Sequence, residues 1–400
     1  MKMNKVKLGD IADVNSTTFR VNDFDEILYL DTSSVTRGFF DNFIYLSKND
    51  TIPSRAKRAI RDKTIVYSTV RPNLQHFGIF KNPQDNIVVS TGFATIDVKD
   101  NIVDPKYLYY NLTQEHYTNA LHTIATNNVS SYPSINPSDL ENLELEITKD
   151  ISTQSAIARI LSSLDDKIEL NNKINKELEN LARTIYEYWF VQNAEEKWEK
   201  GKLSEIANIT MGQSPDGNSY NENGNGIIFY QGCTDFGVRF PTIRQYTTAP
   251  TRFAEMGDIL LSVRAPVGSL NFANTKCCIG RGLAALNSKI GSITHLYFIL
   301  KDLETLFKRR NTDGTTFGAI TKDDLFSLPV TKPSKEILMR FEKIAKPIFD
   351  KQFEIAEENA NLAHLRDFLL PLLMNGQVTV NKAQDEPTII PLKTVPTIKN

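Results

Sequence analysis

Residues 151–192 read ISTQSAIARILSSLDDKIELNNKINKELENLARTIYEYWFVQ and contain neither proline nor glycine. Apolar side chains recur at spacings of three and four, which predicts one helix of about forty residues, roughly 60 Å long. The predicted heptad seam, interrupted at Lys167 and Asn171, comprises Ile157, Ile160, Leu164, Ile174, Leu178, Leu181, Ile185 and Tyr188. Since so long a helix cannot enclose a core by itself, it needs a partner helix with a matching seam.

Residues 334–376 supply that partner. A shift of 184 residues, which carries Ile157 onto Phe341, brings the two apolar patterns into the same phase. The second pattern comprises Phe341, Ile344, Ile348, Ile355, Leu362, Leu365, Leu369 and Leu372. Pro347 is expected to kink this helix or break it near its start, and Gly376 is expected to end it.

The segments before each helix are also repeated, as five short matches in the same order indicate. KLGDIADVNST from Lys7 returns as KLSEIANITMG from Lys202, TIVYSTVRP from Thr64 as DILLSVRAP from Asp258, TGFATI from Thr91 as RGLAAL from Arg281, YLYYNL from Tyr107 as HLYFIL from His295, and SDLENLEL from Ser138 as DDLFSLPV from Asp323. The offset falls from about 195 to about 185 residues, as loop insertions and deletions would produce.

The chain therefore divides into a domain (1–150), a helix (151–192), a second domain (193–333), a second helix (334–376) and a proline-containing tail (377–400) expected to be loosely ordered. A second helix that packs on the first must run back along it. We expect an antiparallel coiled coil with one globular domain at each end, and an approximate twofold axis relating the two halves.

Each domain is predicted to be α+β, with short strands separated by turn residues. The clearest strand patterns are Glu26–Leu30, Thr64–Val70, Asn86–Ser90, Gly226–Tyr230 and Asp258–Val263, with short helices near Tyr107–Asn119 and Ile293–Phe307. The order of the strands does not follow from the sequence.

Composition narrows the class of protein. The 400 residues carry a formal net charge of −2, which argues against strong binding of a polyanion by this chain alone but not against local basic surfaces. No apolar run is long enough to cross a membrane, and the first residues lack the apolar core of a signal peptide. Three cysteines, two of them adjacent, fit a reduced, cytoplasmic setting.

Catalytic motifs are absent from the sequence. It contains no GxxxxGK[ST], no NPP[FY] tetrapeptide of the kind that amino-methyltransferases use, and no glycine-rich turn after a strand. Its five histidines are scattered without metal-ligand spacing. The acidic pair Glu195 and Glu196 before Lys197 resembles the end of a nuclease motif, but no suitable carboxylate precedes it, and a solvated charge cluster explains it better.

Basic and polar loops are instead the candidate sites, because Arg and Lys suit phosphate contacts and amide and hydroxyl groups can read base edges. The candidates are Arg55, Lys57, Arg58, Arg61, Arg71, Asn73, Thr91, Asn128, Ser130, Ser131, Tyr132, Arg264, Arg281, Arg309, Arg310, Thr315 and Thr316. Arg71 and Arg264 are predicted to correspond, each at a strand end before a turn. Each group also has an ordinary explanation: a solvated helical face, a polar loop, or an arginine that bonds turn carbonyls.

Taken together, these residues resemble the specificity subunits of type I restriction-modification systems (the HsdS family) over nearly the whole chain. The resemblance is carried by KLGDIADV and KLSEIANI, by SVRAPVG (262–268), by IARILSSLDDKIELNNKINKELENLA in the first helix and by LLPLLMNG at the end of the second. It implies two target recognition domains, each reading half of a bipartite, asymmetric DNA site.

The resemblance also implies that the two helices are spacers that dock two modification (methyltransferase) subunits. The docking or coiled-coil residues would be Ile174, Leu178, Leu181, Ile185, Leu362, Leu365, Leu369 and Leu372. Restriction subunits would join the full complex, and AdoMet, ATP and Mg²⁺ would belong to those partners, because this chain is expected to be non-catalytic and to hold no cofactor or metal.

Other interpretations remain open at this point. The chain is alternatively the specificity subunit of a related methylating nuclease of another type, a coiled-coil scaffold whose end domains bind proteins rather than DNA, or an enzyme with an unrecognised site. The lack of convergent His, Cys or carboxylate motifs counts against the last.

Overall fold

The computed structural model describes residues 2–99, 102–128, 133–312, 319–380 and 389–391, with the backbone alone at Asn128, 304–312 and 389–391. The chain forms two compact units: unit 1 consists of Met1–Glu169 with Asn361–Asn400, and unit 2 of Leu170–Ala360. Unit 1 contains the first repeat (Met3–Thr148) and unit 2 the second repeat (Glu199–Lys332). Each unit also contains part of both long helices.

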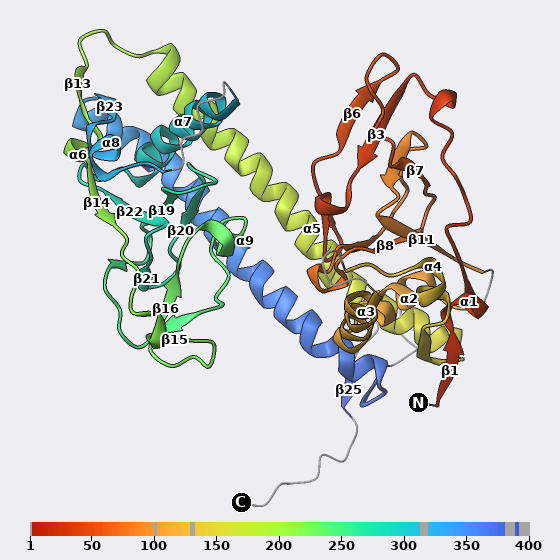
Figure 1. The fold of residues 1–400 in the computed structure, drawn as a ribbon. Helices are drawn as coiled ribbons and strands as arrows, with labels where there is room; N and C mark the ends of the chain where they lie inside the picture. Colours follow the sequence, from red (N-terminus) through yellow and green to blue (C-terminus); the bar gives the residue numbers. More distant parts are fainter. Residues whose placement is uncertain (1, 100–101, 129–132, 313–318, 381–388, 392–400) are drawn as a thin grey trace, which may run out of the picture. The chain divides into compact units, whose positions relative to one another are not determined.

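The first repeat contains two four-stranded sheets (Figure 1). One has the order β6–β3–β10–β7, with β3 and β10 parallel, and the other, β2–β11–β8–β9, is antiparallel throughout. The strands span Ile44–Ser47 (β6), Glu26–Leu30 (β3), Ile87–Ser90 (β10), Ala56–Ala59 (β7), Ala12–Val14 (β2), Phe93–Val98 (β11), Ile65–Ser68 (β8) and Phe77–Ile79 (β9). All residues of β8 and β10 are buried, because each strand lies between two neighbours and carries mostly β-branched side chains.

Helices cover the antiparallel sheet and complete one core with the long helices of unit 1. Asp104 caps α2 by accepting from Tyr107 N–H at 3.0 Å, and Pro105 occupies the first helical position. The remaining elements are α1 (Leu8–Ile11), α2 (Pro105–Leu112), α3 (Glu115–Asn128), α4 (Pro137–Glu141), β1 (Met3–Lys7), β12 (Glu144–Thr148), β4 (Val35–Thr36), β5 (Phe39–Phe40), η1 (Val21–Asp23), η2 (Thr32–Ser34) and η3 (Pro72–Leu74). The single helix predicted near Tyr107–Asn119 is thus two helices.

The second repeat has the same plan in unit 2. Its sheets have the orders β15–β17–β16–β21–β18, with β16 and β21 parallel, and β14–β22–β19–β20. The elements are β13 (Glu199–Lys202), α6 (Leu203–Ile206), β14 (Ala207–Met211), η5 (Gly217–Ser219), β15 (Tyr220–Asn221), β16 (Ile227–Tyr230), η6 (Cys233–Asp235), β17 (Tyr246–Thr247), β18 (Phe253–Ala254), β19 (Ile259–Ser262), β20 (Leu270–Phe272), β21 (Cys277–Ile279), β22 (Leu283–Ser288), α7 (Ile293–Thr312), α8 (Lys322–Ser327) and β23 (Pro329–Lys332). The shared strand order and the shared parallel pair confirm the predicted α+β fold and its duplication.

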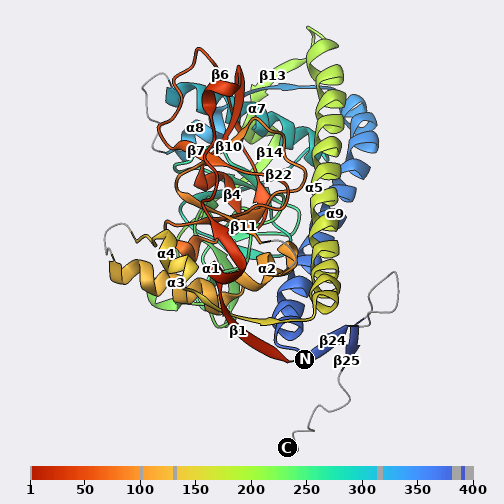
Figure 2. The same cartoon turned by 90° about the vertical axis from the view of Figure 1, so that its right-hand side faces the viewer.

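The two long helices are continuous (Figure 2): α5 spans Ile151–Glu187 and continues as a π-helical turn, η4 (Tyr188–Gln192), and α9 spans Lys335–Met374. Pro347 does not break α9. The helices are antiparallel in unit 2, where Asn171 contacts Asn359 and Asn175, further along α5, contacts Gln352, which is earlier in α9. In unit 1, Asp165 of α5 pairs with Arg366 of α9.

The buried seam differs from the predicted one. On α5 the side chains of Ile157, Leu161, Ile168, Asn171, Asn175 and Ala182 are buried, whereas Ile174, Leu181 and Tyr188 are 38, 49 and 57% exposed. On α9, Leu369 is buried but Ile344 and Leu365 are 45 and 43% exposed. The seam therefore includes two asparagines and an alanine. The predicted positions that lie beside it are Ile174, Leu181, Tyr188, Ile344 and Leu365. Asn171 is a member of the seam and not an interruption of it.

The segment after α9 begins with a strand. Strand β24 (Val378–Val380) pairs with β25 (Ile389–Pro391), and Val378 and Val380 pack against the core of unit 1. The rest of the tail for which loose order is expected, residues 381–388 and 392–400, lies outside the described residues.

Candidate nucleic-acid interface

Corresponding strand ends in the two repeats are held by the same backbone hydrogen bonds. The bonds are Thr69 N–H to Gly92 C=O (2.8 Å) and Ile135 N–H to Thr69 C=O (2.9 Å) in the first repeat, and Val263 N–H to Gly282 C=O (2.9 Å) and Ile320 N–H to Val263 C=O (2.8 Å) in the second. We call these corners the strand-end surfaces. The first comprises Arg55, Thr69–Arg71, Thr91–Gly92 and Pro133–Ile135, and the second comprises Ser214, Gln231, Val263–Arg264, Arg281–Gly282 and Ala319–Ile320.

The predicted correspondence of Arg71 with Arg264 is wrong by one residue. The hydroxyl of Ser68 donates to the Val70 carbonyl at 2.8 Å, and the hydroxyl of Ser262 donates to the Arg264 carbonyl at the same distance. Val70 is therefore the counterpart of Arg264. Arg71 follows with a left-handed backbone (φ 46°) and donates its N–H to Pro133 C=O. Both segments contain the dipeptide Val-Arg (Val70-Arg71 and Val263-Arg264), and aligning these dipeptides gave the wrong correspondence.

The five basic residues from Arg55 to Lys63 do not form one surface. They lie on and around strand β7, not on a helix, so Lys57 and Arg58 point to opposite faces. Burial lowers the pKa of Arg58, and Arg61 Nε donates to the buried carboxylate of Asp97 at 3.1 Å. Arg55 is exposed and lies on the first strand-end surface, where its Nη2 is 2.9 Å from the place that a Cβ on Gly92 would occupy.

In the second repeat Arg281 is held by a short network of polar side chains. Its Nε and its backbone N–H both lie 3.3 Å from Ser214 Oγ, and Gln231 Nε2 donates to the same hydroxyl at 2.9 Å. The loops that carry Ser214 and Gln231 differ between the repeats, so no sequence signal pointed to these two residues. The register of β16 beside β21 places Gln231, and the backbone bonds from Gly212 N–H to Leu283 C=O and from Gln213 N–H to Ile279 C=O place Ser214.

The other predicted residues are distributed as follows. Thr91 is half-buried on the first strand-end surface, and Asn73 is exposed on η3, which packs against α3. Asn128, Arg309 and Arg310 are placed by backbone only, at the ends of α3 and α7. Ser130, Ser131, Tyr132, Thr315 and Thr316 lie outside the described residues, although the residues that follow them, Pro133–Ile135 and Ala319–Ile320, belong to the strand-end surfaces.

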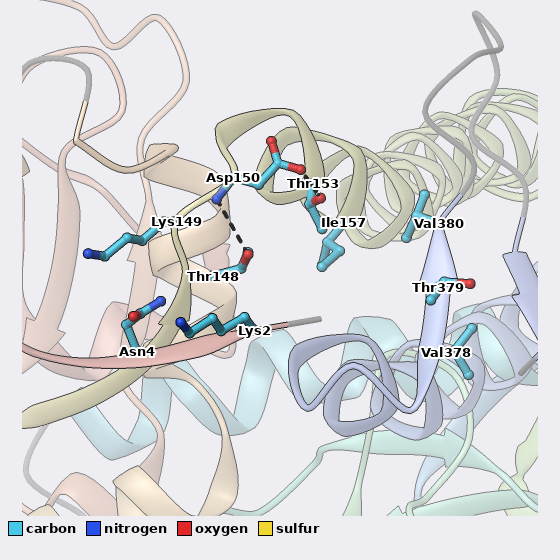
Figure 3. Close-up of a pocket in the computed structure, with 10 residues that line it drawn as sticks. All are labelled: Lys2, Asn4, Thr148, Lys149, Asp150, Thr153, Ile157, Val378, Thr379 and Val380. Atoms are coloured by element: carbon cyan, nitrogen blue, oxygen red, sulfur yellow. Dashed lines mark hydrogen bonds between the residues drawn. The ribbon is translucent and has the colours of Figure 1, made fainter.

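A cavity of about 500 Å³ opens in unit 1 at the start of α5 (Figure 3). It is lined by Lys2, Asn4, Thr148, Lys149, Asp150, Thr153, Ile157 and Val378–Val380. The carboxylate of Asp150 accepts a hydrogen bond from Thr153 Oγ1 at 2.5 Å. The lining therefore offers no pair of groups arranged for acid–base chemistry within the residues the structure describes.

Among the residues that the structure describes, no group of three or more His, Cys, Asp or Glu side chains is arranged to hold a metal ion. Among the same residues, no helix combines the length and the apolar character that spanning a membrane requires.

The chain belongs to the family described as the type I restriction modification DNA specificity domain, whose model matches residues 1–180 and again 195–361. Each match covers one repeat together with most of the long helix that follows it. The chain is therefore a specificity-type subunit of a restriction-modification system, whose family role is DNA recognition, and not a catalytic subunit.

Individual relatives agree with this assignment. The chain is 30% identical over 331 residues to the putative type I restriction enzyme MjaX specificity subunit of Methanocaldococcus jannaschii, covering 76% of each chain. It is 26% identical to the type I restriction enzyme HindI specificity subunit of Haemophilus influenzae, covering 93% of this chain and 98% of the relative. The crystal structure of a type I restriction-modification S subunit from M. genitalium shares the fold, with a TM-score of 0.54 at 18% identity over 93% of this chain and 96% of that one.

Proposed function

We propose that each repeat reads one half of a bipartite DNA target through its strand-end surface. The observation that carries this proposal is that the two surfaces share one backbone framework but present different side chains. Thr91 stands where Arg281 does, and Val70 stands where Arg264 does. A common framework with different side chains suits two readers of different half-sites, and so an asymmetric target.

Phosphate contacts and the loops beside these surfaces complete the proposed interface. Lys57, Arg71, Asn73, Arg309 and Arg310 are candidates for backbone contacts that fix the register of the duplex. The segments with Asn128, Ser130, Ser131 and Tyr132, and with Thr315 and Thr316, are candidates for base contacts. Arg58 and Arg61 are weaker candidates because one is half-buried and the other is bonded to Asp97.

The helix pair is proposed to set the unread gap between the half-sites. Helix α5 belongs to both units, as does α9, and their 37 and 40 residues correspond to roughly 55 and 60 Å of helix. In DNA readers with two half-sites, the distance between the reading elements fixes the spacing of the target. The number of unread base pairs should therefore follow the length of these helices.

The same helices are proposed to dock two modification subunits, with restriction subunits joining the complete enzyme. Leu181 of α5 and Leu365 of α9, which the 184-residue shift superimposes, are 49 and 43% exposed in units 2 and 1 respectively. Exposed apolar side chains at helical spacing mark a protein contact. Their equivalence supports binding of two copies of one partner.

An exchange of domains tests the reading function. Residues 1–150 are replaced by those of a relative with another target, and the methylated sequence is determined by methylation-sensitive sequencing of a host genome. The expected result is a change in one half of the methylated sequence and no change in the other half. A change in both halves, or in neither, would contradict the assignment of one domain to one half-site.

Leu181→Asp tests the docking function, with Asn180→Asp, a neighbouring exposed position, as the matched control. Because Leu181 lies beside the seam, the variant should melt within about 2 °C of the parent yet lose most of its co-purification with the modification subunit. Normal co-purification would show that this face is not the docking surface.

A further inference from the structure

Each strand-end surface has one arginine beside its glycine, Gly92 in the first repeat and Gly282 in the second. The two arginines come from different positions in the sequences of the repeats. In the second repeat Arg281 directly precedes Gly282. In the first repeat Thr91 takes that position before Gly92, and the Thr91 N–H donates to the Arg55 carbonyl at 2.8 Å. The backbone of Arg55 is thus bonded directly to Thr91, the residue equivalent to Arg281, and Arg55 Nη2 lies over Gly92.

The backbone beneath Arg281 is held rigidly. Gly280 N–H donates to Tyr230 C=O at 2.8 Å and Gly282 N–H donates to Gln231 C=O at 3.1 Å. A Cβ on Gly280 or on Gly282 would lie 2.9 Å or less from atoms of Gln231, so both glycines are required for this close approach. The Cα of Arg281 therefore has a fixed position, which suits a residue that must meet its ligand in one geometry.

The two guanidinium groups are also available. Arg281 is exposed and uses Nε for Ser214, and neither of its terminal nitrogens has a protein partner in the described parts of the chain. Within those same residues Arg55 is exposed and has no carboxylate within 4.0 Å. Arginine without a carboxylate partner, presented as a planar fork, pairs with O6 and N7 of guanine in the major groove.

We propose that Arg281 reads a guanine in the half-site of the second repeat, and that Arg55 reads a guanine at the corresponding place in the other half-site. Ser214 and Gln231 are positioning residues for Arg281, since Ser214 bonds its Nε and its backbone N–H, Gln231 bonds Ser214, and the terminal nitrogens are left for the base. This inference rests on the proposed function, because it names the base that each strand-end surface recognises.

A phosphate contact is the competing role for such an arginine, and the surroundings argue against it. Phosphate binding requires charge but tolerates variable geometry, whereas Arg281 is fixed at Nε by a hydroxyl that is itself bonded to Gln231. The two half-sites should still differ at neighbouring bases, because Val70 stands where the second repeat has Arg264.

The test uses the chain assembled with its modification subunit, and duplexes carrying either its own methylated sequence or a scrambled one. Arg281→Ala should weaken binding to the target duplex roughly ten- to a hundredfold while changing binding to the scrambled duplex less than twofold. The methylated sequence should lose its requirement for one guanine in one half only. Arg55→Ala should do the same in the other half. Lys289→Ala is the control, because Lys289 is exposed just beyond the opposite end of β22.

Positioning by Ser214 is tested separately. Ser214→Ala should lower discrimination at the guanine that Arg281 reads and at no other base, and Ser214→Thr should restore it, whereas general loss of structure would lower binding to every sequence alike.

Two results would overturn the inference. Equal loss of binding to target and scrambled duplexes would show a phosphate contact, and an unchanged methylated sequence in Arg281→Ala would show that the residue reads no base. Failure of the proposed function looks different, because the parent complex itself would then bind target and scrambled duplexes equally.

Discussion

Arg239 offers the most quantitative test of how the second repeat is fixed to the helices within unit 2. It lies in the loop between β16 and β17 and is 7% exposed. Its Nη2 donates to Glu179 of α5 at 3.0 Å, its Nη1 to the Tyr297 hydroxyl at 3.1 Å, and it also bonds Gln352 of α9. The guanidinium is 5.0 Å from the ring centroid of Phe349. One side chain thus joins the recognition domain to both helices.

Replacement by methionine keeps the apolar stem and removes the charge. A buried ion pair that loses one partner costs about 3–5 kcal/mol of the free energy of unfolding, because the other charge stays desolvated. Glu179 is 28% exposed and keeps the Tyr297 hydroxyl as a donor, so the lower end applies. We expect Arg239→Met to cost about 3 kcal/mol, which lowers the melting temperature of a unit of this size by about 6–12 °C.

Differential scanning calorimetry of the full chain measures this effect. Lys276→Met is the matched control: Lys276 pairs with Glu255 in the same repeat, but both side chains are more than half exposed, so the loss should stay below about 1 kcal/mol. Adding Glu179→Gln to Arg239→Met should recover much of the stability. Equal melting temperatures for Arg239→Met and Lys276→Met would refute the assigned role of the buried pair.

Burial lowers the pKa of His295 to about 4, whereas the pKa of a histidine in the unfolded chain is about 6.5. The free energy of unfolding is therefore at its full value above pH 6.5 and decreases as the pH drops toward 4. Denaturant titrations should show about 2 kcal/mol lost between pH 7 and pH 5, a loss that His295→Phe removes and that exposed His364→Asn retains. Gly212→Ala should cost about 1–3 kcal/mol in the same assay, since its Cβ would lie 2.1 Å from the Gly280 carbonyl. Gly217→Ala, with nothing within 4 Å, should be neutral or slightly stabilising, and equal effects of the two would contradict the packing at Gly212.

The duplication and the long helices were predictable because they depend on patterns that span many residues. The 184-residue shift correctly relates α5 to α9, since the buried positions Ile157 and Leu161 return as buried Phe341 and Ala345. An apolar periodicity that extends over forty residues still predicts the helix correctly when a few of its positions are misassigned. The strand orders were not predictable, because nothing in a short apolar run specifies which other strand it pairs with.

The seam was misplaced because the prediction counted only apolar residues. Asn171 is 1% exposed and donates to Glu358 and Asn359 at 2.8 Å. A polar side chain can therefore occupy this seam position because hydrogen bonds across the helix pair satisfy its amide group. Ile174 and Leu181 are more hydrophobic but lie beside the seam. Which residues are buried depends on such pairings across the two helices, and those involve residues more than 180 positions apart in the chain.

The displaced apolar residues bear on function. A helix pair selected for its own stability would bury leucine and expose asparagine, and α5 does the reverse at several neighbouring positions. Buried polar residues in a helix seam fix the register of the two helices. Exposed leucines cost solubility unless another protein covers them. Departures of this kind from the simplest pattern tend to occur at functional surfaces. Ile174, Leu181 and Leu365 are three of the positions at which the sequence-based seam is wrong, and we therefore propose that the modification subunits bind there.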